Sequence, residues 1–401
     1  MFSKKNSYPK SDGLVLLLIV CVMLAASAGC TPKIEEEEDI YPPPTIEEWV
    51  LPVVVSITGD YLDTGMAVAW GFTYGTNVVN EQGGIRGVPA TFTIRDAASS
   101  DTQVISEIGL VAPEALIVMG PPEEDLYKAG QLAFYSARMP VVGAATDNEN
   151  RAAYKPYAIS CISNPGSEAI TAVYYWVEAG PFSSVYIFTS PLFSERNDSA
   201  KAAFSAYEIE IVDEAIISNE SFDAAGAAEK AFELQPDAYY IDLDGENALR
   251  LIRHLKYLAG DDAGKMNILC GPGLADVSFL EPMEEDEVIG IGARVWATFD
   301  PNKDSEKRKV FDETFKKNVD DNSYYSIAVD YYQSALMIKQ AIETLGLMGS
   351  SIALEKERES LAEYLYNSDT FTTDQGDFIM VDGNKVTVAK LYRITENGFE
   401  L

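Results

Sequence analysis

The stretch Val53–Gly84, with the sequence VVVSITGDYLDTGMAVAWGFTYGTNVVNEQGG, decides the fold. Its first five residues are apolar and mostly β-branched, which predicts a short buried strand. A turn at Thr58-Gly59-Asp60 follows, and the spacing of apolar residues predicts a helix over 65–80. Two glycines, Gly83 and Gly84, end that helix. The unit is therefore a strand, a turn and a helix.

The same alternation continues along the chain. We expect further strands at 91–94, 115–119, 140–143, 184–188, 209–212, 238–241 and 267–270, and helices at 102–111, 125–135, 167–177, 195–207, 223–234 and 246–258. Strands separated by helices of this length predict parallel sheets that are covered on both faces. A turn at Asn164-Pro165-Gly166 divides the series in two. The sequence thus predicts an α/β protein with two Rossmann-like lobes.

The first thirty residues indicate export. Three lysines precede Leu14–Ala28, an unbroken run of apolar or small residues that is shorter than the about 20 residues of a membrane-spanning helix. The run ends in Ser27-Ala28-Gly29-Cys30, which resembles the bacterial lipobox, although Ser27 stands where leucine is commonest. The resemblance implies a lipoprotein signal peptide over residues 1–29 and a lipid on Cys30. A retained membrane helix is the alternative.

Residues 30–48 are predicted to be a tether. They contain the acidic run Glu35–Asp39 and the prolines Pro42–Pro44, a charged and stiff stretch that cannot bury a core. Such a segment would hold a folded body away from a membrane. We therefore expect an extracytoplasmic protein that is lipid-anchored to the cell membrane, in the periplasm or at the cell surface.

The composition argues against several classes of function. The 401 residues are 47% hydrophobic, and 63 Asp and Glu outweigh 30 Lys and Arg to give a formal charge of -33. Such a surface repels nucleic acid and anionic bilayers, so we expect no nucleic-acid partner and membrane contact through the lipid anchor only. The single histidine, His254, cannot build a multi-histidine metal site. No nucleophile is paired with a base, and we predict no metal, no cofactor and no enzymatic activity.

Two cysteines remain once Cys21 is assigned to the signal and Cys30 to the lipid. An extracytoplasmic location permits a disulfide between Cys161 and Cys270. Their 109-residue separation, without a framework pattern, favours two separate buried thiols.

An ordered series of motifs resembles the branched-chain amino acid receptors, the type I periplasmic-binding proteins of ABC transporters. Its most specific part is the Asn-Glu-x-Gly-Gly-Ile-x-Gly block at residues 80–87. The other matching residues are Ser56–Gly59, Gly65, Gly71, Arg95-Asp96, Ser99–Asp101, Gly143–Thr146, Gly271-Pro272 and Ser326–Ser334. The resemblance runs from about Val50 to the C-terminus.

The resemblance implies two lobes joined by three crossover segments, with a ligand cleft between the lobes. On that pattern the N-terminal lobe holds residues 49–164 plus 298–367, and the C-terminal lobe holds residues 165–297 plus 368–401. Open α/β sheets also place ligands at the carboxyl ends of their strands. The loops expected to line the cleft are therefore 58–64, 120–125, 143–147, 190–196, 242–245 and 271–273.

The family holds an α-amino acid by its charges, and the candidate ligand-binding residues follow from it. They are Thr64, Glu123, Ala144, Ala145, Thr146, Arg196, Asp244, Gly273 and Tyr324. The resemblance implies a carbonyl from Ala144, a hydroxyl from Thr146 and an aromatic wall from Tyr324. The family's serine for the ligand carboxylate is replaced in Gly120–Glu124, and its glutamate for the ammonium is replaced by Gly273.

These departures shift the expected ligand. Like charges a few ångströms apart repel strongly when they are desolvated, so Glu123 or Asp244 would oppose a ligand carboxylate. We expect a neutral or positively charged ligand with an amide or amine. One alternative is that Arg196 restores a carboxylate site. Another is that Glu123, Glu195 and Arg196 are solvated rim residues.

The sequence therefore predicts a substrate-binding lipoprotein of an ABC transporter. It would capture a small polar solute of the branched-chain amino acid or amide class by hinge closure and deliver it to an ABC permease. A surface-anchored ligand sensor or scaffold, with the same fold and an altered pocket, is the alternative.

Overall fold

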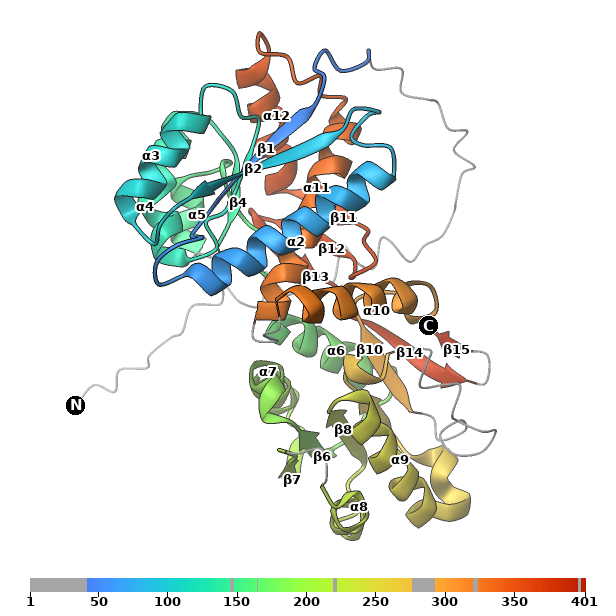
Figure 1. The fold of residues 1–401 in the computed structure, drawn as a ribbon. Coiled ribbons are helices and arrows are strands. Elements are labelled where there is room, and N and C mark those ends of the chain that lie inside the picture. Colours follow the sequence, from blue (N-terminus) through green and yellow to red (C-terminus); the bar gives the residue numbers. More distant parts are fainter. Residues whose placement is uncertain are drawn as a thin grey trace, which may run out of the picture. The chain divides into compact units, whose positions relative to one another are not determined.

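The computed structural model describes residues 42–144, 148–163, 165–218, 222–275, 293–319, 324–395 and 398–401. Two α/β sheets organise these residues, and both lie in the compact unit Pro43–Leu401 (Figure 1). The prediction of two α/β lobes is confirmed. The expected signal peptide, most of the expected tether and the expected lipidation site Cys30 lie outside the described residues.

The first sheet has the strand order β11-β12-β13-β5-β4-β3-β1-β2. Its strands are β1 (Trp49–Val55), β2 (Ala90–Asp96), β3 (Val118–Met119), β4 (Val141–Gly143), β5 (Ala158–Ser160), β11 (Ser368–Phe371), β12 (Phe378–Val381) and β13 (Asn384–Thr387). Strands β1 to β5 and β13 pair in parallel, whereas β11 and β12 are antiparallel to their neighbours.

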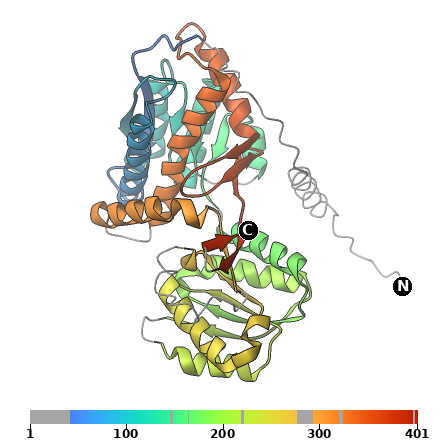
Figure 2. The same ribbon diagram turned by 90° about the vertical axis from the view of Figure 1, so that its right-hand side faces the viewer.

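Helices cover both faces of the first sheet (Figure 2). Helices α2 (Leu62–Glu81) and α11 (Tyr325–Leu345) cover one face, and α3 (Asp101–Val111) and α4 (Glu124–Ser136) cover the other. Helix α10 (Pro301–Asn318) packs its aromatic side chains against α2 and α11. The remaining helices of this lobe in the described part of the chain are α5 (Asn148–Ala153) and α12 (Leu354–Tyr366). Alternate residues of a strand point to opposite faces, so Val53 and Val55 join the core under α2 and α11 while Val54 joins the core under α3 and α4. This explains the unbroken apolar run in the sequence.

Helices α2 and α11 lie side by side because glycine removes the side chains at their contact (Figure 1). A Cβ atom on Gly71 would lie 2.2 Å from the carbonyl oxygen of Ala328, and one on Gly75 would lie 2.8 Å from that of Tyr332. Both approaches are too close for any larger residue. The two glycines therefore set the distance between the helices.

The second sheet has the strand order β15-β14-β10-β9-β8-β6-β7. Its strands are β6 (Ser184–Thr189), β7 (Glu210–Ile216), β8 (Ala238–Asp242), β9 (Ile268–Cys270), β10 (Arg294–Ala297), β14 (Lys390–Thr395) and β15 (Gly398–Glu400). Helices α6 (Pro165–Ala179) and α7 (Ser194–Ala206) cover one face, and α8 (Ala224–Glu233) and α9 (Gly245–Ala259) cover the other. Three short 3-10 helices, η1 (Pro191–Phe193), η2 (Gly260–Lys265) and η3 (Pro272–Leu274), follow β6, α9 and β9.

The chain passes between the two sheets three times: after β5, after β10 and after β13. The three crossovers agree with the expectation. The expectation that all of residues 368–401 belong to the C-terminal lobe is wrong for residues 368–387, because β11, β12 and β13 extend the first sheet beyond β5. Only β14 and β15 of this segment join the second sheet.

The Asn-Glu-x-Gly-Gly-Ile-x-Gly block has a structural role. The Asn80 side chain accepts from the Ala90 N–H and donates to the Ala90 carbonyl, both at 2.8 Å, which fixes the end of α2 against β2. The Arg86 guanidinium donates to the carbonyls of Gly346 and Leu347 beyond the last turn of α11. This block therefore connects α2, β2 and α11.

Both cysteines of the described chain are free and buried, which confirms the prediction for Cys161 and Cys270. Burial also raises the pKa of the Cys161 thiol to about 12. A thiol with such a pKa is protonated and unreactive near neutral pH.

A buried arginine joins three helices of the first lobe. Arg358 of α12 is 6% exposed, and its guanidinium donates to the carbonyl oxygens of Ala115 at 2.8 Å, Ala112 at 2.5 Å and Ala137 at 3.1 Å. The last two are the C-cap residues of α3 and α4. The positive charge lies where the helix dipoles are negative.

We predict that Arg358→Met lowers the free energy of unfolding by about 3 kcal/mol, because the buried carbonyls lose their donor. Chemical denaturation measures the change. The matched control is Arg138→Met, because Arg138 is 58% exposed and its partner, Glu355, is exposed as well. That variant should change the free energy by less than about 0.5 kcal/mol. Equal losses in both variants would contradict the assignment.

Candidate functional site

The loops that follow β1, β3 and β4 are bonded to one another at the carboxyl edge of the first sheet. The Ala144 N–H donates to the Pro121 carbonyl at 3.1 Å, and the Tyr61 hydroxyl donates to Asp125 at 2.9 Å. Gly120 has φ 76°, and a Cβ atom there would lie 2.2 Å from the Val54 carbonyl oxygen. Parallel strands end at one edge, so residues from three separate segments meet there.

Glu123 is the most unusual group at this edge. It is the residue before α4, and its backbone is extended while its side chain makes no capping hydrogen bond. Both carboxylate oxygens are buried and have no hydrogen-bond partner among the described residues. Burial, with a smaller contribution from the nearby Asp125, raises the pKa of Glu123 to about 7 against the lowering effect of its own backbone N–H. A buried carboxylate without a partner is costly, so this group is available to a ligand.

The other candidates of the first lobe lie on the same edge. Ala144 is 2% exposed and directly follows β4, and Thr64 is half-buried in the first turn of α2. Tyr324 precedes α11 and lines a small depression with Asp63, Met66, Trp70, Asn318 and Val319. Ala145 and Thr146 lie outside the described residues, so their predicted roles stay predictions.

Arg196 lies at the carboxyl edge of the second sheet and is already paired. Its Nε and Nη2 atoms donate to the two oxygens of Asp242 at 3.0 and 2.7 Å. The guanidinium also lies 4.1 Å from the Phe193 ring centroid and 5.7 Å from that of Trp296. Asp242 is 0% exposed, so the two charges neutralise each other inside the lobe. The alternative that Arg196 is a solvated residue at the rim of the cleft is therefore wrong. Glu195, for which the same alternative was given, is exposed.

Asp244 and Gly273 have structural roles in the second lobe, and the Asp244 carboxylate is already hydrogen-bonded to the protein. Asp244 is the N-cap of α9, and its oxygens accept from the backbone N–H of Asn247 at 3.0 Å and from its side-chain amide at 2.8 Å. A Cβ atom on Gly273 would lie 2.4 Å from the Leu243 carbonyl oxygen. The small residue is therefore required where the loop after β9 meets the loop after β8.

One electrostatic group contains three residues that were not among the candidates: the buried Asp330 and Lys385 and the half-buried Glu168. Lys385 donates to Asp330 at 2.7 Å, and the two side chains are 2% and 1% exposed. Burial raises the pKa of Glu168 to about 7, against the opposing effects of Lys385 and of a hydrogen bond from Thr387. Asp330 lies in a motif of the sequence, but nothing in its spacing to Lys385, 55 residues later, predicts the pair.

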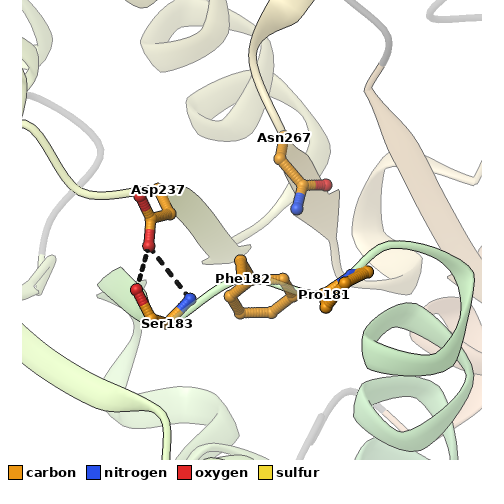
Figure 3. Close-up of a pocket in the computed structure, with 5 residues that line it drawn as sticks. All are labelled: Pro181, Phe182, Ser183, Asp237 and Asn267. Atoms are coloured by element: carbon orange, nitrogen blue, oxygen red, sulfur yellow. Dashed lines mark hydrogen bonds between the residues drawn. The ribbon is translucent and has the colours of Figure 1, made fainter.

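Apart from this edge, a shallow depression occurs at the amino ends of β6, β8 and β9 (Figure 3). Asp237 there accepts from the Ser183 hydroxyl at 2.6 Å and from its N–H at 2.9 Å, and Asn267 accepts from Trp176 at 2.7 Å. Because these polar groups are already bonded to the protein, the depression offers a ligand little.

Among the residues that the structure describes, acidic, cysteine and histidine side chains do not gather in groups of three or more that could hold a metal ion. Among the same residues, no helix is long and apolar enough to cross a membrane.

Comparison with known proteins agrees with this arrangement. The profile of the family described as periplasmic binding protein matches residues 48–398. A search of curated proteins finds no match. A solved structure assigned to a branched-chain amino acid ABC transporter from Rhodospirillum rubrum is 16% identical, with a TM-score of 0.58 over 88% of this chain and 99% of that chain.

Two other solved structures are similar at lower scores. An ABC transporter substrate-binding protein from Sphaerobacter thermophilus is 18% identical, with a TM-score of 0.49 over 87% of this chain and 94% of that chain. The transporter substrate-binding protein LivJ from Streptococcus pneumoniae, in complex with isoleucine, is 17% identical, with a TM-score of 0.46 over 88% and 97%.

The profile covers most of the chain, and the Rhodospirillum structure shows the same two-lobed fold. Together they confirm the resemblance found in the motifs and the type I fold it implies. The chain belongs to the periplasmic binding protein family.

Proposed function

We propose that the chain is the extracytoplasmic, lipid-anchored substrate-binding protein of an ABC transporter. It captures a small polar solute of the branched-chain amino acid or amide class by hinge closure and delivers it to a permease. The family supports this proposal, because its members act outside the cytoplasm and bind solutes without converting them. The cysteine at position 30, after an apolar run and before an acidic stretch, supports the lipid anchor.

The observation that carries the ligand assignment is the pair of buried Glu123 oxygens without a hydrogen-bond partner in the described part of the chain. A carboxylate accepts hydrogen bonds only, so its complement is an N–H group or a cation. An amide or amine on the ligand would satisfy both oxygens. A ligand carboxylate at the same position would be repelled.

The charged residues of both lobes support the same assignment. A ligand carboxylate requires an available cation, and Arg196 has committed two donors and its charge to Asp242. Lys385 is committed in the same way to Asp330. Glu168, which interacts electrostatically with Lys385, Arg196 and Asp330, has a pKa that burial raises, and so does Glu123. The balance of charge favours an amide or amine over a free acid.

The first test uses stability. Because the pKa of Glu123 is raised from 4.5 to about 7, its contribution to stability is present below about 4.5 and is lost as the pH rises through about 7. We predict that Glu123→Gln increases the free energy of unfolding by about 1–3 kcal/mol at about pH 8 and has little effect at about pH 5. Denaturant titrations at the two pH values measure this. A uniform effect at both would contradict the raised pKa.

The second test uses calorimetric titration of the protein, refolded to remove bound solute, against branched-chain amino acids, amides, amines and aromatic acids. We predict that an amide or amine binds, and that its affinity rises by up to about 100-fold between about pH 5 and pH 8 as Glu123 ionises. Glu123→Gln should remove this pH dependence.

The matched control is Glu124→Gln, because Glu124 is exposed and pairs with Lys128 at the surface. It should leave affinity and pH dependence unchanged. Binding of leucine, isoleucine or valine with no dependence on Glu123 would overturn the ligand assignment. If the folded protein binds nothing in the panel, a ligand sensor or scaffold replaces the transport receptor.

The lipid anchor has its own test. We predict that Cys30→Ser moves the chain from the membrane fraction to the soluble fraction of the producing bacterium, because the negatively charged body has no attraction to an anionic bilayer. Metabolic labelling with a fatty acid should mark the unaltered chain and fail to mark the variant. Membrane association that survives the substitution would favour a retained helix at Leu14–Ala28.

A further inference from the structure

A single buried polar network contacts all three crossover segments. The segments are residues 161–164 after β5, 298–300 after β10, and 388–389 after β13. We call the network the hinge hub and define it as Asp330, Gln333 and Lys385 together with the loop 373–377.

Asp330 of α11 holds the first crossover. Its Oδ2 atom accepts from the Ser163 N–H at 3.0 Å, and its Oδ1 atom accepts from the Ser163 hydroxyl at 2.5 Å. The same Oδ1 accepts from the Lys385 ammonium at 2.7 Å. Because Asp330 is 1% exposed, these contacts are screened little by water.

Lys385 links the hub to the third crossover. It lies on β13, two residues before that strand ends at Thr387 and the chain leaves for the second sheet. Its ammonium donates to Gln333 at 2.5 Å as well as to Asp330. Within the crossover, the Val388 N–H donates to the carbonyl of Asp377 in the hub loop at 3.5 Å. Just beyond it, the Lys390 ammonium donates to the Asp377 carboxylate at 2.7 Å.

Gln333 and the loop 373–377 hold the second crossover. The Gln333 amide donates to the Thr373 hydroxyl at 2.9 Å and to the Gly376 carbonyl at 3.1 Å. The next residue, Asp377, donates its N–H to the Thr298 carbonyl at 2.8 Å. A Cβ atom on Gly376 would lie 2.6 Å from the Thr298 hydroxyl oxygen, so only glycine permits this approach.

A carboxyl group of the second lobe also interacts with the hub. The Glu168 carboxyl of α6 interacts electrostatically with Lys385 and Asp330, and Thr387 hydrogen-bonds to it. Glu168 is flanked on its own helix by Ala169, which lies in the core of the second lobe. A change in the distance between α6 and β13 therefore changes the electrostatic environment of Lys385.

We propose that the hinge hub is the pivot of the lobe motion: it fixes all three crossover segments to α11 of the first lobe, and Lys385 is its central positioning residue. A buried ion pair is strongly disrupted when one partner is removed, because the other charge is left uncompensated. Loss of Lys385 would release Asp330, Gln333 and the crossovers they hold. The lobes would then sample a wider range of separations.

The test measures distances between the lobes by electron spin resonance in the absence of ligand. Nitroxides are placed through Leu132→Cys on α4 and Tyr257→Cys on α9, which are 67% and 84% exposed. Cys21 and Cys30 are replaced by serine in the full chain, and the buried Cys161 and Cys270 are retained. We expect Lys385→Met to widen the distance distribution by about twofold. Asp330→Asn and Ser163→Ala should widen it less.

The matched control is Arg358→Met, which removes an equally buried cation from the first lobe without touching a crossover. It should lower the melting temperature and leave the distribution as in the parent. An unchanged distribution in Lys385→Met, or equal widening in Arg358→Met, overturns the proposal. Should Lys385→Met fail to fold, unchanged distributions in both Asp330→Asn and Ser163→Ala overturn it. No ligand is added, so failure of the proposed ligand does not affect the result.

Discussion

The ion pair between Asp330 and Lys385 is the interaction on which the two-lobed arrangement depends. Both side chains are almost completely buried. Hydrogen bonds connect the pair to Ser163 in a segment that runs between the lobes and to Gln333 on α11. Burial of two charges is expensive and needs complete hydrogen bonding to be offset. Ser163 and Gln333 supply that bonding. The pair therefore requires one particular placement of chain segments that are far apart in sequence.

The same physical rule explains the contrast between the two lobes at the candidate site. In the second lobe, the buried carboxylate of Asp242 has a bidentate arginine partner and is a closed unit. In the first lobe, the buried carboxylate of Glu123 has no described partner, and its proton affinity is raised as a result. A group that the protein leaves unsatisfied is the natural place for a ligand. On the proposed function, it is therefore the carboxylate of Glu123, and not that of Asp242, that selects the solute.

The order of elements could be predicted from the sequence because it depends on local patterns. Val53–Val55 form the last part of β1, and their side chains alternate between two different cores. The helix expected at 65–80 lies within α2. The buried free thiols also followed from composition and spacing. The roles of Asp244 and Arg196 did not, because a helix cap and a salt bridge depend on how near a donor is in space.

The sequence by itself determined the two α/β lobes, the alternation of helix and strand over residues 53–270 and the family, since hydrophobic periodicity and glycine positions act within a few residues of the chain. Only the tertiary structure decided that β11–β13 extend the first sheet, that Lys385 meets Asp330 and that Glu123 is buried without a described partner. Strand pairing at a sheet edge and the pairing of buried charges are settled by contacts between distant segments. The physical reason is that their free energy depends on desolvation and proximity, and neither quantity is defined until the chain has folded.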